Sequence, residues 1–202
     1  ATAIQTFKQC VAVGSVEDEP ECAMGAARLS LGSGSREDAR SQFKKLAAMP
    51  GKGSAAFFSA WARLELARIQ DSEIPFPKLT REGLAAELPR RLQAFESVQK
   101  AYAPVLEAGG GFSVSASRRL GQVAMELASE MEAIASDDPK AQKVVETLRA
   151  NAIQFFRQSQ QKAVEGEWIS PELPKLVVEL GLAQRIAPAQ GAFPVLVMAP
   201  FS

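Results

Sequence analysis

The sequence predicts an all-α protein of antiparallel helical hairpins, stacked as a short α-solenoid and followed by a non-helical C-terminal tail. The hydrophobic share of 47% over 202 residues is typical of a folded globular chain. Alanine is abundant while β-branched and aromatic residues are sparse, which favours helix over strand. Apolar residues recur at the helical period between short turns, and short connections imply antiparallel neighbours.

Amphipathic segments alternate with turns rich in glycine, proline or acidic residues. Pro89 is expected to interrupt one long segment, Pro104 to bend it again, and Gly109-Gly110-Gly111 to form a tight turn. Thr80 is expected to cap the start of that segment. The expected helices cover residues 2–13, 20–31, 35–49, 54–70, 80–108, 113–136, 139–165 and 170 to 181 or 184.

The segment 71–79 contains Pro75 and Pro77 and is the best candidate for a boundary between sub-regions. The chain is therefore divided into N-terminal hairpins, C-terminal hairpins and an extended tail, with the two sets of hairpins forming one continuous array. These three parts cover residues 1–72, 80–186 and 187–202.

The expected helix over residues 54–70 is apolar around more of its circumference than a surface helix needs. Two adjacent stripes run along it, one of Phe57, Trp61 and Leu64 and the other of Phe58, Ala62, Leu66 and Ile69. A helix of this kind packs between neighbours on two sides, as inner members of a stacked array do.

Two stretches of the chain share a pattern. Large–small pairs occur at Trp61-Ala62 and Leu120-Gly121, each preceded by a turn and by an aromatic residue late in the previous helix, Phe43 or Tyr102. This pattern resembles tetratricopeptide-type helical repeats, although the two stretches are further apart than the ~34-residue unit of that family.

Residues 102–107 and 116–123 are similar to repeat proteins of large bacterial envelope and gliding-motility machineries. The resemblance implies a scaffold that binds other proteins and has no catalytic residues.

Charge and composition exclude several classes of function. The 23 Lys and Arg residues balance 23 Asp and Glu residues, so the chain lacks the basic surplus of a nucleic-acid binder. Histidine is absent, which removes His-based nucleophile systems and His-ligated metals. No apolar run approaches the ~18 residues that span a bilayer. We expect no catalytic, cofactor-binding or metal site and no transmembrane segment.

Cys10 and Cys22 are the only cysteines and lie near the facing ends of the first two expected helices. We expect a disulfide between them, which would imply an oxidising compartment and a periplasmic or otherwise exported protein. The alternative is two buried, reduced thiols, since cysteine behaves as a small hydrophobic residue.

Other polar groups have simple structural interpretations. The acidic run at Glu17, Asp18, Glu19 and Glu21 is expected to be a solvated loop, because it lacks the ligand spacing of a calcium site. The pairs Arg90-Arg91 and Arg118-Arg119 are expected on solvated helix faces with acidic neighbours, in preference to partner contacts.

The C-terminal run is strongly apolar and bracketed by prolines. Its apolar residues are Phe193, Val195, Leu196, Val197 and Phe201, together with Met198 and Ala199. We expect it to cover the exposed edge of the last helices, as a terminal repeat requires. The alternative is a segment that docks on a protein partner.

The function expected from these observations is a non-catalytic protein–protein interaction scaffold in a bacterial cell-envelope assembly. The sequence does not identify the partner. Two alternatives remain open: a cell-wall-processing enzyme that uses carboxylates such as Glu107, Glu126 or Glu130, and a cytosolic helical regulatory module.

Overall fold

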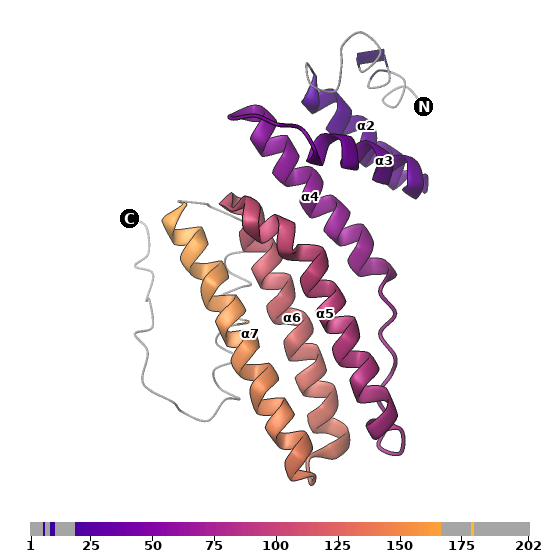
Figure 1. Ribbon diagram of the computed structural model, residues 1–202, viewed down its shortest axis with the longest axis vertical. Coiled ribbons are helices and arrows are strands. Elements are labelled where there is room, and N and C mark those ends of the chain that lie inside the picture. Colours follow the sequence, from indigo (N-terminus) through magenta and orange to yellow (C-terminus); the bar gives the residue numbers. More distant parts are fainter. Residues whose placement is uncertain (1–5, 7–8, 11–18, 167–178, 180–202) are drawn as a thin grey trace, which may run out of the picture.

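The computed structural model describes residues 19–166 together with Thr6, Gln9, Cys10 and Glu179 (Figure 1). It confirms each helix expected between residues 20 and 165, and the described residues include no strand. The tail at 187–202 lies outside the described residues, as do most of the helices expected at 2–13 and 170–184. The helices are α2 (Pro20–Gly32), α3 (Arg36–Ala47), α4 (Ser54–Glu73), α5 (Leu84–Ala108), α6 (Gly110–Ala135) and α7 (Pro139–Glu165).

Each described helix packs against the next one along the chain, from α2 through to α7. The most extensive contact joins α6 and α7, and in Figure 1 these two helices run side by side with α5 on the other side of α6. The small helices α2 and α3 pack along α4, and α3 contacts it from Ser59 to its last residue, Glu73. The described part of the chain is therefore a short α-solenoid of antiparallel hairpins, as expected.

Helix α4 contributes to two separate hydrophobic cores. Ala62 and Ile69 pack in an N-terminal core with Met24, Phe43 and Leu46 of α2 and α3. Leu64 and Ala67 belong instead to a larger core formed with the buried faces of α5, α6 and α7. The expected two-sided packing of this helix is confirmed.

Phe57 stands apart from the rest of its stripe. Its side chain is 42% exposed, at the N-terminal end of α4. Its ring packs against Phe58 and Trp61 and reaches Phe112 of α6, with ring centroids 5.2 Å apart. This aromatic contact joins the N-terminal hairpins to α6.

Helix α5 begins at Leu84, four residues later than expected. Thr80 is not the cap of α5, because the N-cap is Gly83 and no side chain caps the helix. The Thr80 hydroxyl instead accepts a hydrogen bond from the Gly83 amide at 3.1 Å, within the turn that precedes the helix. The Glu87 carboxylate accepts from both the amide and the hydroxyl of Thr80, at 2.9 and 3.2 Å. A short turn over residues 81–83 therefore separates Thr80 from α5.

The expected interruption near Pro89 is wrong, since α5 runs continuously from Leu84 to Ala108. Pro89 lies in the second helical turn, where the missing amide sacrifices one hydrogen bond close to the helix start. Arg91 and Ala94 just beyond it are buried against the neighbouring helices, and this packing keeps the helix intact. Figure 1 shows α5 bent near its C-terminal end, the end that contains Pro104.

The turn between α5 and α6 is shorter than expected. Gly109 alone connects the helices, and α6 begins at Gly110 instead of Ser113. Gly109 and Gly110 have φ values of +71° and +63°. Residues with a Cβ avoid this left-handed region, so glycine is what permits so abrupt a reversal.

Gly121 lies where α6 packs closely against α7. A Cβ placed there would come within 2.5 Å of the Phe156 ring, which is itself 1% exposed. The glycine of the Leu120-Gly121 pair is therefore required by the approach of an aromatic ring from α7.

We expect Gly121→Ala to lower the free energy of unfolding. Alanine raises helix propensity by about 1 kcal/mol, but overpacking a buried ring that has no room to move costs about 1–3 kcal/mol. Urea denaturation followed by circular dichroism measures the difference. The double variant Gly121→Ala/Phe156→Leu should lose less than the sum of its two single substitutions, and additive losses would contradict this packing.

Candidate functional site

A cleft with a largely polar lining lies between α4, α5 and α6 and has a volume of about 460 Å³. We call it the arginine cleft. Its polar lining residues are Arg68, Asp71, Ser72, Tyr102, Ser115, Arg118, Arg119 and Gln122, and its apolar lining residues are Leu64, Ile74 and Phe76.

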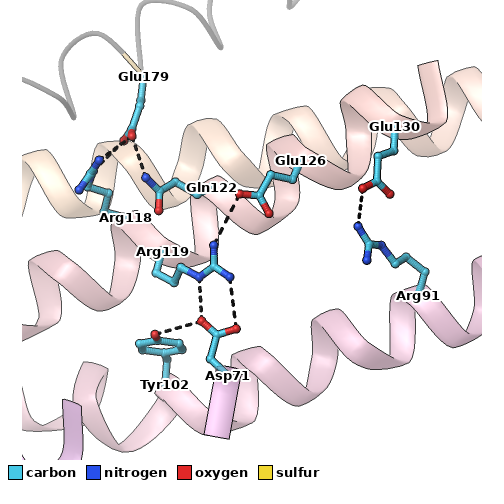
Figure 2. A network of polar contacts seen from close by, with 9 residues as sticks. All are labelled: Asp71, Arg91, Tyr102, Arg118, Arg119, Gln122, Glu126, Glu130 and Glu179. Atoms are coloured by element: carbon cyan, nitrogen blue, oxygen red, sulfur yellow. Dashed lines mark hydrogen bonds and ion pairs between the residues drawn. The ribbon is translucent and has the colours of Figure 1, made fainter. Parts of the chain in front are cut away.

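Asp71, near the C-terminal end of α4, is the centre of the hydrogen-bond network in this cleft (Figure 2). Arg119 of α6 donates to it through Nε at 2.7 Å and through NH2 at 3.3 Å. The Tyr102 hydroxyl of α5 donates to the same carboxylate at 3.3 Å. One carboxylate thus joins three helices.

Burial and charge fix the protonation of this network. Burial raises the pKa of Tyr102 above its usual value, and the negative charge of Asp71 raises it further. The hydrogen bond to Asp71 raises the pKa of Arg119. Tyr102 therefore stays a neutral phenol and Arg119 a cation at physiological pH, which suits a structural tie between helices.

The other arginines of the cleft also face acids. Arg118 donates to Glu179 through Nε at 2.8 Å and NH2 at 2.7 Å, and Gln122 donates to the same carboxylate at 2.7 Å (Figure 2). Glu179 belongs to the segment expected to form the last helix. Arg68 pairs with Glu65 at 3.3 Å. The cations of this cleft are thus matched by carboxylates of the same chain.

The expected placement of the arginine pairs on solvated faces is wrong for two residues. The side chains of Arg91 and Arg118 are only 9% and 14% exposed. Arg91 pairs with Glu130 of α6 at 2.7 Å and stacks on the Phe76 ring with its guanidinium carbon 4.6 Å from the ring centroid. Each of these two arginines pairs with a carboxylate from a distant part of the chain. The spacing of residues within one helix does not reveal such a pair.

A second concave surface, which we call the basic groove, lies between α3, α4 and α5 and has a volume of about 410 Å³. Its cationic residues are Arg40, Lys44, Arg63 and Lys100, and its one acidic residue is Glu73. Its remaining lining residues are Leu66, Ala67, Gln70, Ala101 and Pro104.

The cations of the basic groove are only partly neutralised. Arg40 pairs with Glu73, the one carboxylate in the lining, at 2.5 Å. Arg63 donates to the Ala47 carbonyl at the end of α3, at 3.4 Å. Lys44, Arg63 and Lys100 contact no carboxylate within the described residues. The groove has no signature in the sequence, because its cations come from three separate helices.

A disulfide joins Cys10 and Cys22, whose Cα atoms are 6.0 Å apart, so the expected pairing is confirmed. The two sulfur atoms and the Glu19 carboxylate lie within 4.8 Å of one another. Metal binding at cysteine requires free thiolates, and in the disulfide both sulfurs are bonded to each other. Glu19 and Glu21 are exposed, whereas residues 17 and 18 lie outside the described structure.

The carboxylates considered for hydrolysis point to different partners. Glu126 lies 3.6 Å from Arg119, and Glu130 pairs with Arg91 (Figure 2). Glu107 is exposed near the end of α5. The apolar tail residues Phe193, Val195, Leu196, Val197 and Phe201 lie outside the described residues, so their expected role stays a prediction.

The described part of the chain is therefore an all-helical array of stacked hairpins that includes the arginine cleft and the basic groove. No protein-family model, curated protein or solved structure matches the chain. Among the described helices, none combines the length and the hydropathy needed to cross a bilayer.

We expect the folded protein to hold the Tyr102 proton to higher pH than the unfolded chain, whose tyrosine ionises near pH 10. The raised Tyr102 pKa stabilises the folded state fully below pH 10. This stabilisation is lost as the pH rises towards the pKa of the folded protein. Absorbance of tyrosinate reports Tyr102 alone, because it is the only tyrosine.

The variant Asp71→Asn should lower the Tyr102 pKa, since it removes the neighbouring negative charge, while burial should keep that pKa above the value in the unfolded chain. A folded wild type that titrates like the denatured protein would refute the network.

We expect no free thiol when the unreduced protein is unfolded in guanidinium chloride and titrated with a thiol reagent. Reduction, or Cys22→Ser, should lower the free energy of unfolding by roughly 3 kcal/mol, because the cross-link restricts the unfolded chain. Reduction of the Cys22→Ser variant is the control and should have no further effect. Two reactive thiols in the wild type would argue against the disulfide.

Proposed function

We propose that this chain is a non-catalytic scaffold of the tetratricopeptide-like helical-repeat type that holds a protein partner in the basic groove. One observation carries the proposal: the basic groove is open, and three of its cations contact no carboxylate within the described structure. Three stacked helices, α3, α4 and α5, build its walls, as they build the binding surfaces of helical-repeat arrays.

The arginine cleft supports the same proposal by contrast. Its carboxylate, phenol and guanidinium groups are bonded to one another, and the pKa of Tyr102 is shifted away from neutrality. A general acid or base needs a pKa near the working pH. We therefore assign this cleft to the attachment of α4 to α5 and α6.

The disulfide supports placing the scaffold outside the cytosol. Disulfides persist in oxidising compartments and are rare where thioredoxin and glutathione keep thiols reduced. Together with the resemblance to repeat proteins of bacterial envelope machineries, this favours a periplasmic or otherwise exported adaptor. The alternative as a cytosolic regulatory module would leave the disulfide without a purpose.

We expect a photo-crosslinking amino acid at position 70 to capture a protein partner in intact cells of the native source. Gln70 is exposed and lines the basic groove. The matched control is position 154, because Gln154 is also exposed but lies on α7 and does not line the groove. Adducts separated by gel electrophoresis and identified by mass spectrometry should form at position 70 and not at 154.

The absence of adducts at position 70 in cells that express the folded protein would contradict the scaffold proposal. Adducts at 154 alone would move the binding surface to α7. Adducts at both positions with the same set of proteins would indicate random proximity and would also contradict it.

A further inference from the structure

We propose that the basic groove binds an acidic, extended segment of the protein partner, with its carboxylates against Lys44, Arg63 and Lys100 and its backbone over the small residues of the groove floor. This inference rests on the proposed scaffold function and adds the chemical class of the partner. The feature that carries it is the convergence of three cations from three different helices, none of which contacts a carboxylate among the described residues.

Charge is segregated within a neutral chain. Acidic and basic residues balance overall at 23 each, yet the lining of the basic groove contains four cations and one carboxylate. That carboxylate, Glu73, is shared by Arg40 and by Arg36, which lies 3.5 Å away. The remaining positive charge has no counterpart inside the groove, so an acidic ligand supplies the complement.

Arg63 is held in position before any ligand binds. Its NH2 donates to the Ala47 carbonyl at 3.4 Å, and the Ser59 hydroxyl donates to the same carbonyl at 2.9 Å. The guanidinium is thus fixed at the end of α3 with donors left over for a carboxylate. A preorganised donor loses little conformational entropy on binding.

The floor and size of the groove favour an extended segment over a helix. Ala67 and Ala101 are buried and Leu66 is partly buried, so the floor is apolar and two of its side chains are as short as a methyl group. A volume of about 410 Å³ is comparable to sites for small ligands and holds a few side chains. A whole helix, roughly 10 Å across, needs a longer trough.

A peptide fits the charge count better than a nucleic acid. Nucleic-acid binders gain most of their affinity by neutralising many phosphates with a surplus of basic residues. Three cations that contact no carboxylate in the described structure, on a molecule of zero net charge, match a segment with two or three carboxylates instead.

The test uses the complete chain and a fluorescein-labelled peptide of alternating glutamate and alanine, followed by fluorescence anisotropy at low salt. A peptide with glutamine at every glutamate position is the neutral probe, and oligothymidylate is the polyanion probe. We expect the glutamate peptide to bind, the neutral peptide not to bind, and oligothymidylate to bind more weakly than the glutamate peptide. Salt should weaken the binding that occurs.

The double variant Lys44→Glu/Lys100→Glu should weaken binding of the glutamate peptide roughly tenfold or more. The matched control is Lys45→Glu/Lys143→Glu. Lys45 is in the same last turn of α3 as Lys44, both control residues are exposed, neither lines the groove, and the net charge changes equally. The control should bind within about twofold of the wild type, a change that is negligible in free energy.

Four outcomes would overturn the inference. The first is that the glutamate peptide does not bind the folded wild type, and the second is that the control variant loses as much affinity for the peptide as Lys44→Glu/Lys100→Glu. The third is that oligothymidylate binds more tightly than the peptide through the same lysines. The fourth is that the wild type self-associates and Lys44→Glu/Lys100→Glu abolishes the self-association. Crosslinks at position 70 without binding of the glutamate peptide would contradict the acidic ligand but support the scaffold function. Peptide binding without cellular crosslinks would contradict the scaffold function but support an acidic ligand in the groove.

Discussion

The structure depends on a single requirement, that α4 must bury two faces at once. Ala62 and Ile69 complete the N-terminal core, while Leu64 and Ala67 complete the core of α5, α6 and α7. Small residues alternate with large ones, so helices approach closely on both sides. Without α4, apolar surface would be exposed on both sets of hairpins.

The ionic network around Asp71 complements that packing. The chain leaves α4 and travels through residues 74–83 before α5 begins, a connection long enough for the two helices to separate. Arg119 and Tyr102 hold the C-terminal end of α4 against the next two helices through one carboxylate. Charged groups in the arginine cleft are thereby committed to structure, whereas Lys44, Arg63 and Lys100 of the basic groove contact no carboxylate in the described part of the chain.

Local patterns in the sequence predict the described helices well. Apolar periodicity and turn residues locate each helix from 20 to 165, and the width of the apolar face on α4 reveals its two neighbours. The cysteine pairing follows from an even count and facing helix ends. Pro89 misleads because the propensity rule describes an isolated helix, and here packing outweighs it.

The sites depend on information that no local pattern contains. Arg91 is expected at the surface, yet it pairs with Glu130, a residue of another helix, and is buried in the contact. The basic groove is likewise assembled from Lys44, Arg63 and Lys100, each unremarkable within its own helix. Such groups meet only when the hairpins stack, so their proximity is a property of the tertiary structure.

The balance of charge over the whole chain determines how the basic groove attracts a ligand. With a net charge of zero, the molecule generates little long-range field, and the potential of a few cations decays over about 8 Å at physiological ionic strength. Encounters are therefore not steered from afar, and bulk polyanions in the surroundings are not concentrated on the surface. Selectivity for the proposed acidic segment would then depend on contacts inside the groove between α3 and α5.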